Sequence, residues 1–144
     1  MTRERNVLLI FDEVQTGFGR TGRVWAFENY GVEPDIFTAG KSIAGGLPIG
    51  VAVVRREFGD VFEPGGEHGS TFAGNPLVMA AAKAGVEVLI NDNVPERVRA
   101  VGDRFMRVLE DELNGLKTVL RVKGMGGLML GVELRKRLIH ILIG

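Results

Sequence analysis

Three groups of polar side chains in this sequence have the residue types and positions that chemistry would need: Asp12 with Gln15, Lys41, and the pair Ser70-Thr71. The first two groups each follow a short apolar run that predicts a strand: a buried parallel strand at 7–11 and a second short strand at 36–39. Open α/β sheets bind their ligands at the carboxyl ends of their strands. We therefore expect Asp12 and Lys41 to face the same ligand.

An amine, a carboxylate and a hydroxyl-bearing, glycine-rich turn suit pyridoxal 5'-phosphate (PLP). Its aldehyde needs an amine to form an imine, and its pyridine nitrogen needs a carboxylate that keeps it protonated, so that the ring accepts electrons. Its phosphate needs N–H and O–H donors. Taken singly, Lys41 is typical of a solvated lysine, Asp12 of a strand-end cap and Thr71 of a turn. Their occurrence together, in this order, is what favours a PLP site.

Two glycine motifs suggest other ligands. Gly17-Phe-Gly-Arg-Thr-Gly22 matches the G-x-G-x-x-G pattern of dinucleotide sites, but other residues separate it from the strand and no long amphipathic helix follows. Gly40-Lys41-Ser42 resembles the end of a P-loop, which would require glycine where this chain has Asp35. Residues 8–13 resemble a Walker B strand, but they precede Lys41, whereas a Walker B strand follows the lysine of the P-loop. Neither a dinucleotide nor an NTP site is favoured.

The remaining patterns predict the elements that hold these residues. We expect a short helix at 24–30 that Gly31 ends, a strand at 51–54, helices at 77–90 and 95–113, and strands at 119–122 and 128–134 around Gly124–Gly127. Asn75 and Pro76 are typical of an N-cap and a first helical turn. The small apolar side chains of 77–90 predict a largely buried helix. Strands followed by helices indicate an α/β layer, and the pattern after residue 93 indicates a second, α+β unit.

Composition excludes several classes of protein. The 18 basic and 18 acidic residues cancel, so we expect neither nucleic acid nor an anionic membrane as a partner. The absence of cysteine excludes disulfides and thiolate metal sites, and we predict no metal site. No apolar run approaches the ~20 residues of a membrane span, and the start of the chain lacks the apolar core of a signal peptide, which favours the cytoplasm. The 21 glycines gather at 17–74 and 124–131, where tight turns and close approach to a ligand explain them equally well.

Three blocks between about Asn6 and Leu134 resemble one family, in order and with family-like spacing. They are Asp12-Glu-Val-Gln-Thr-Gly-Phe-Gly-Arg-Thr-Gly22, Pro34-Asp-Ile-Phe-Thr-Ala-Gly-Lys41 and His68-Gly-Ser-Thr-Phe-Ala-Gly-Asn-Pro76. They resemble the class-III aminotransferases, most strongly the acetylornithine and ornithine aminotransferase branch. The resemblance implies the type I fold of PLP-dependent transferases. It also implies that residues 1–92 are part of the PLP-binding large domain and residues 93–144 part of the small C-terminal α+β domain.

The resemblance further implies a role for each residue of the site. Lys41 would form the aldimine with PLP and then move the proton between substrate and cofactor, while Asp12 would pair with the pyridinium nitrogen. Val14 would press on one face of the ring, and Gln15 would contact the ring hydroxyl. Ser70-Thr71 would bind the phosphate across the interface of a homodimer. The implied reaction transfers an amino group from an amino acid donor to a 2-oxo acid.

Departures from the family predict limits on this activity. The family's phosphate-cupping loop and the aromatic residue that stacks on the cofactor would lie upstream, and an arginine that holds the substrate carboxylate would lie downstream. The tail 135–144 does not resemble the family, and Ala73 stands where glycine is usual. We therefore expect a C-terminal-half fragment that is prone to aggregate and has weak or no transaminase activity. A non-catalytic remnant, acting as a binding or interaction fragment, is an equal alternative.

Overall fold

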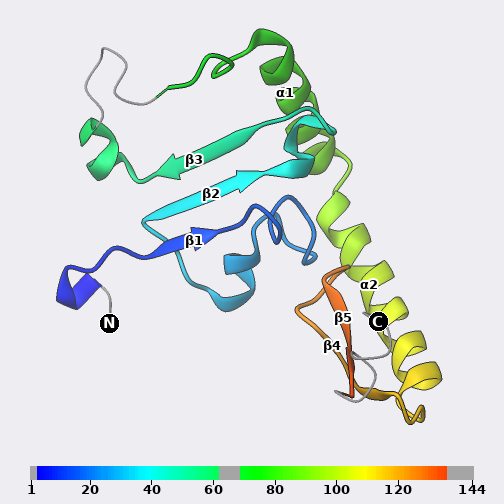
Figure 1. Cartoon of the computed structure of the whole chain (residues 1–144). Helices are drawn as coiled ribbons and strands as arrows, with labels where there is room; N and C mark the ends of the chain where they lie inside the picture. The colour runs from blue at the N-terminus through cyan, green and yellow to red at the C-terminus, as the bar shows by residue number, and fades with distance from the viewer. Residues whose placement is uncertain (1–2, 62–68, 136–144) are drawn as a thin grey trace, which may run out of the picture.

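The computed structural model describes residues 3–61 and 69–135. Within them it holds a three-stranded sheet, two α-helices, a two-stranded sheet and short 3-10 helices: η1 (Arg3–Arg5), β1 (Ile10–Asp12), η2 (Ala26–Tyr30), β2 (Ile36–Gly40), η3 (Lys41–Ala44), β3 (Gly50–Val54), η4 (Arg56–Val61), α1 (Pro76–Asn91), α2 (Val94–Leu113), β4 (Val119–Gly124) and β5 (Leu130–Leu134). Figure 1 shows α1 beside one end of the larger sheet and α2 running from there to the β4–β5 hairpin. The mixture of strands and helices agrees with the predicted α/β class. The division into two domains near residue 93 stays a prediction.

The first sheet places the ends of two strands side by side. β1 runs parallel to β2, with Asp12 opposite Thr38, and β2 runs antiparallel to β3. Because parallel strands point the same way, the residues that follow β1 and β2 emerge at one edge of the sheet. This is the arrangement that the sequence predicts for the polar groups of the site.

β1 is shorter and more exposed than the buried strand predicted at 7–11. Val7 and Ile10 expose 54% and 58% of their surface. β1 lies at one edge of the described sheet, so no described strand covers its outer side. Before the strand, the side chain of Asp35 accepts a hydrogen bond from Leu9 N (2.8 Å), so a side chain rather than a strand satisfies that amide.

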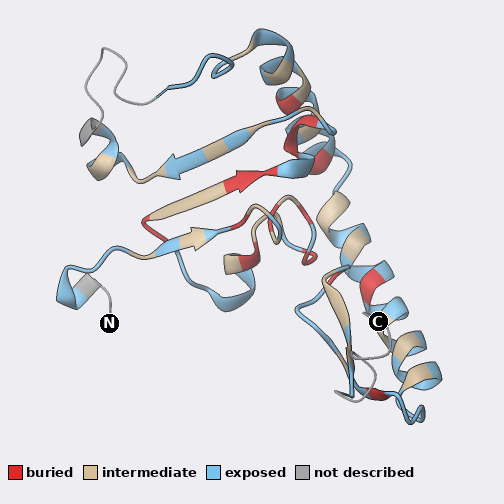
Figure 2. Cartoon of the chain, viewed as in Figure 1, coloured by how far each residue is buried: buried red, intermediate tan, exposed pale blue. Residues whose placement is uncertain are grey.

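α1 begins where the sequence predicts, but most of its surface is exposed. The Asn75 side chain accepts hydrogen bonds from Leu77 N (3.0 Å) and Val78 N (3.3 Å), as an N-cap does. The prediction of a largely buried helix is wrong, because Ala82 and Leu89 are the only buried residues of α1 in the described structure (Figure 2). α1 packs mainly on η3, through one face. No helix in the described ranges is both long and apolar enough to cross a membrane.

The core is small and lies between α1 and the turn that follows β2. Its buried residues, flanked by partly buried aromatic rings, are Ala39, Ile43, Ala44 and Ala82. Among the flanking rings, those of Trp25 and Phe37 lie 4.7 Å apart. Gly85 of α1 approaches η3 so closely that a Cβ there would stand 2.3 Å from the carbonyl oxygen of Ile43. This contact holds η3, whose first residue is Lys41.

β4 and β5 form the antiparallel hairpin that the sequence predicts, and its turn packs on two other segments. A Cβ on Gly102 of α2 would stand 1.9 Å from the carbonyl oxygen of Gly127, and a Cβ on Gly127 would stand 2.6 Å from Gly22 N. Leu128 N also donates a hydrogen bond to the carbonyl oxygen of Arg20 (3.0 Å). These glycines therefore serve close backbone packing between the hairpin turn, α2 and the loop after β1.

Candidate active site

The carboxyl end of β2 presents Lys41 from an unusual backbone conformation. Lys41 directly follows β2 and has a φ of 51°, in the left-handed region where residues with a side chain are strained. The preceding Gly40 packs closely on the loop before β3, because a Cβ there would stand 2.9 Å from the carbonyl oxygen of Ile49. Contacts on both sides of Lys41 thus fix the backbone from which its amine extends.

The amine of Lys41 meets a side chain from the end of the neighbouring strand. Its Nζ donates a hydrogen bond to Oε1 of Gln15, which lies in the loop after β1. Both side chains are exposed, so a ligand could reach them. The fold therefore brings together two of the residues that the sequence predicts for one site.

Asp12 ends β1 with its carboxylate held by two donors. Oδ1 accepts hydrogen bonds from Val14 N (3.0 Å) and from Thr38 Oγ1 (3.0 Å). The bond from Val14, then that from Thr38, lowers the pKa of Asp12 below its ordinary value; desolvation opposes the shift and the charge of Lys41 adds to it. The carboxylate is therefore ionised at neutral pH and lies within electrostatic reach of the Lys41 amine.

Val14 is half-buried beside the carboxyl end of β2. Its Cγ1 is 3.9 Å from the point where a Cβ on Gly40 would stand, so its side chain lies beside the residue that precedes Lys41. The structure thus gathers Asp12, Val14 and Gln15 around the carboxyl end of β2. Their individual roles toward a cofactor stay predictions.

Ser70 and Thr71 lie in the segment that leads into α1. Both are exposed, and Ser70 lines a pocket of about 560 Å³ beside the start of β3 and the first turn of α1. Among the described residues, no hydrogen bond or ion pair joins Ser70 or Thr71 to the cluster around Lys41. His68, the first residue of the sequence block that contains Ser70 and Thr71, lies outside the described residues, and phosphate binding by Ser70 and Thr71 stays a prediction.

Sequence reasoning missed two residues that hold this cluster. Thr38 donates to Asp12 from the adjacent strand, at the position that the parallel register places opposite it. Glu13 is 4% exposed, and its carboxylate accepts hydrogen bonds from Thr16 Oγ1 and Phe27 N. The contact of Thr38 with Asp12 depends on the register of the two strands, which short apolar runs do not define. The burial of Glu13 has no signal in the sequence either.

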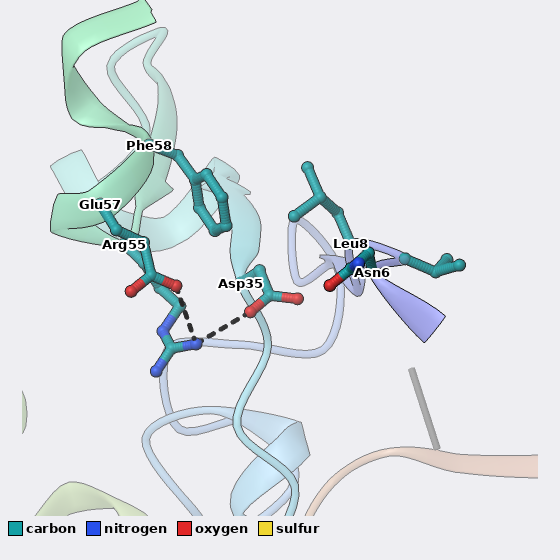
Figure 3. Close-up of a pocket in the computed structure, with 7 residues that line it drawn as sticks. Asn6, Leu8, Asp35, Arg55, Glu57 and Phe58 are labelled. Atoms are coloured by element: carbon teal, nitrogen blue, oxygen red, sulfur yellow. Dashed lines mark hydrogen bonds and ion pairs between the residues drawn. The ribbon is translucent and has the colours of Figure 1, made fainter. Parts of the chain in front are cut away.

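A second pocket, of about 330 Å³, lies at the opposite end of β2 (Figure 3). There Arg55 Nη1 donates to Asp35 Oδ1 at 3.0 Å and lies 3.4 Å from Glu57 Oε1. Asp35 precedes β2 whereas Lys41 follows it, so this pocket is separate from the candidate active site. The ion pair between Arg55 and Asp35 joins the residue before β2 to the residue after β3.

Comparison with known proteins decides the family of the chain. The family model described as aminotransferase class-III matches residues 1–142. The chain belongs to the class-III aminotransferases. The match extends through 135–142, a stretch that the three sequence blocks left outside the resemblance.

Curated class-III aminotransferases that resemble this chain are longer than it is. The chain is 64% identical, over 133 residues, to a putative LysW-aminoadipate semialdehyde/glutamate semialdehyde transaminase of Pyrobaculum aerophilum, covering 92% of this chain and 34% of that protein. It is 48% identical, over 134 residues, to the acetylornithine aminotransferase of Methanothermobacter thermautotrophicus, covering 93% and 34% of the two chains. The chain therefore spans about a third of the length of the curated relatives it matches.

Solved structures place this class-III aminotransferase chain in a known fold. The ornithine aminotransferase of Toxoplasma gondii superposes with a TM-score of 0.88 at 40% identity, covering 94% of this chain and 32% of that one. The active site of that enzyme holds PLP at partial occupancy. The likeness confirms the predicted type I fold of the PLP-dependent aminotransferases.

Proposed function

We propose that this chain forms the part of a PLP-dependent aminotransferase that holds the reactive ring of the cofactor. The enzyme would transfer an amino group from an amino donor to a 2-oxo acid. The observation that carries the proposal is the Lys41 amine beside Gln15, at the sheet edge where the ionised Asp12 also lies. Membership of the class-III aminotransferases supports the reaction class.

The chemistry of the donor set fits PLP. Both described hydrogen bonds to Asp12 go to Oδ1, so Oδ2 is available to a protonated pyridine nitrogen. The Lys41 amine is the group that the cofactor's aldehyde requires, and its position on strained backbone favours a fixed direction of approach. When bound, PLP supplies an electron sink for charge that develops at the substrate carbon. The relative from Toxoplasma gondii, which binds PLP, supports this cofactor.

Each residue of the site would then contribute a separate function. Lys41 would take the proton from the substrate carbon and return it, as a general base and acid. Asp12 would keep the ring nitrogen protonated, Val14 would limit the ring on one face, and Gln15 would orient Lys41 and the ring hydroxyl. Ser70-Thr71 would bind the phosphate of a partner's cofactor in a homodimer.

The relatives' names support a substrate class. Aminoadipate semialdehyde, glutamate semialdehyde, acetylornithine and ornithine all belong to linear amino acids with an amine or an aldehyde at the far end of the side chain. We infer that the donor of this enzyme carries a terminal primary amine, which leaves the carbon as an aldehyde while the 2-oxo acid gains the amino group. The absence of cysteine accords with a cytoplasmic enzyme.

Covalent trapping tests the proposal. The chain would be incubated with PLP, reduced with borohydride and mapped by peptide mass spectrometry, with Lys41→Arg as the test variant and Lys83→Arg as the control. Lys83 lies on α1 with 78% of its side chain exposed, so it reports non-specific reaction. We expect the label on Lys41 in the wild type and in Lys83→Arg, and its loss in Lys41→Arg. Equal labelling of exposed lysines would contradict a PLP site.

One alternative function has an observation in its favour. Because the chain spans about a third of its relatives' length, it could bind PLP or a partner without turnover. A turnover assay with N-acetylornithine, ornithine and a 2-oxo acid separates the two. Product formation that requires Lys41 would support the aminotransferase, whereas PLP labelling without product would support the binding fragment.

A further inference from the structure

Glu13 is a buried carboxylate that stands directly beside the candidate active site. It is 4% exposed. Oε2 accepts a hydrogen bond from Thr16 Oγ1 (2.5 Å), and Oε1 accepts one from Phe27 N (2.9 Å). In its backbone, the amide donates to Thr38 O (2.8 Å) and the carbonyl accepts from Gly17 N (2.9 Å). Side chain and backbone together tie the loop after β1 to β2, to η2 and to itself.

The charge of Glu13 has no cationic partner in the described parts of the chain. Its two oxygens are satisfied by a hydroxyl and a backbone amide, both neutral donors. Burial of a carboxylate without an opposite charge is costly, and such groups persist where their hydrogen bonds fix a needed geometry. A side chain without an acceptor at position 13 would leave the amide of Phe27 without its hydrogen-bond partner.

The loop that Glu13 closes carries two residues of the site. The side chains of Glu13 and Thr16 are hydrogen-bonded to each other, and Val14 and Gln15 lie between them in the sequence. Oε1 of Gln15 accepts the hydrogen bond from Lys41 Nζ. The position of the Lys41 amine therefore depends on a loop whose two ends are joined by the Glu13 carboxylate.

We infer that Glu13 is a positioning residue of this site, which acts on Lys41 through Val14 and Gln15 without touching the substrate or the cofactor. Its two carboxylate oxygens hold the 13–17 loop in the one conformation that places Gln15 at the Lys41 amine. The contribution is geometric, so an uncharged side chain that can make the same two hydrogen bonds should replace it. The effect on PLP labelling of Lys41 rests on the proposed function, whereas the effect on the conformation of the loop does not.

The test compares four variants of the full 144-residue chain. Glu13→Ala removes both acceptors, and Thr16→Val removes one donor while preserving the branched shape of the side chain. Glu13→Gln removes the charge but can accept from Phe27 N and donate to the Thr16 hydroxyl. Glu28→Ala is the matched control, because the exposed Glu28 also accepts a hydrogen bond from a backbone amide in this segment, that of Trp25 (3.0 Å).

The first measurement needs no cofactor. Hydrogen exchange of the apo chain should show about tenfold faster exchange at the Phe27 amide and in the 13–17 loop for Glu13→Ala, since a lost buried hydrogen bond is worth about a factor of ten. Thr16→Val should show a smaller increase in the loop. Glu13→Gln and Glu28→Ala should match the wild type there. Exchange in the β4–β5 hairpin, which serves as an internal reference for global unfolding, should not change.

The second measurement uses trapped PLP. Glu13→Ala and Thr16→Val should lower the share of chains labelled at Lys41, and Glu13→Gln should restore it. The inference is overturned if Glu13→Ala leaves loop exchange unchanged, if Glu28→Ala loosens the loop equally, or if Glu13→Gln fails to rescue. If Glu13→Ala does not fold, Thr16→Val and Glu13→Gln still decide the question. Absence of label in the wild type would refute the proposed function and leave the exchange result valid.

Discussion

A hydroxyl of the adjacent strand contributes to the lowered pKa of Asp12. Thr38 Oγ1 donates to Oδ1 at 3.0 Å across the parallel pair of β1 and β2. Thr38→Val keeps the branched shape of the side chain and removes the donor, so the pKa of Asp12 should rise toward its ordinary value. The bond from Val14 N would persist, and the rise should be partial. Carbon-detected NMR titration of the Asp12 carboxyl measures it.

The direction of this pKa fixes how stability changes with pH. Folding lowers the pKa of Asp12, so its ionised form stabilises the folded chain above the ordinary value of about 3.9. That stabilisation is lost as the pH falls through the lower pKa of the folded state. In Thr38→Val the loss should come at a higher pH in urea unfolding, whereas Thr118→Val, at an exposed threonine, should match the wild type. An unchanged Asp12 titration in Thr38→Val would contradict the assigned cause.

At the scale of residues, the sequence predicts the site residues that follow the two strands, but not Thr38 and Glu13, whose hydrogen bonds hold them in place. Lys41 and Gln15 could be paired in advance because each follows a strand at the same edge of one sheet. The contact of Thr38 with Asp12 depends on register, which short apolar runs leave undefined. Glu13 looks like a second strand-end carboxylate, and its burial depends on η2 folding back to place Phe27 N beside it.

At the scale of elements, local signals predict where α1 begins but not how much of it is covered. Asn75 caps the helix through a local hydrogen bond, so neighbouring residues suffice to predict it. Burial depends on which elements pack on the helix, and α1 packs mainly on η3. The small apolar residues of α1 predicted a largely buried helix, whereas Leu77 and Ile90 expose 69% and 62% of their surface.

Gly85 tests whether the contact between α1 and η3 positions Lys41. A Cβ there would stand 2.3 Å from the carbonyl oxygen of Ile43, which is far inside ordinary contact. Alanine is the better helix former by about 1 kcal/mol, but overpacking against backbone costs about 1–3 kcal/mol, so Gly85→Ala should destabilise the chain overall. Gly115→Ala, where a Cβ would meet nothing within 4 Å, is the control. Urea unfolding measures both variants.

Two outcomes at Gly85 have different meanings. Lower stability together with weaker PLP labelling of Lys41 would support the role of α1 in holding η3. A gain of about 1 kcal/mol, as helix propensity alone would give, would show that the backbone contact does not constrain the fold.

At the scale of the whole molecule, the described chain has a large apolar surface for its small core. No described side chain of large volume is fully buried, and exposed apolar residues occur on β1, α1, α2 and both hairpin strands. Contiguous apolar surface is typical of proteins whose faces are covered by other protein. The curated relatives are about three times as long as the matched segment, so they have further residues available to cover such faces. In the 144-residue chain alone, we expect the same faces to contact one another.

Self-association should therefore rise with concentration, and the exposed end of α1 offers a clean test. Ile90→Lys replaces a residue that is 62% exposed with a cation in the last turn of α1, where the helix dipole favours positive charge. Asn91→Lys adds the same charge one residue later without removing apolar surface. In sedimentation velocity we expect Ile90→Lys to associate less than the wild type and Asn91→Lys to differ little from it. Equal reductions in both variants would assign the association to net charge, and no reduction in either would locate it on another face.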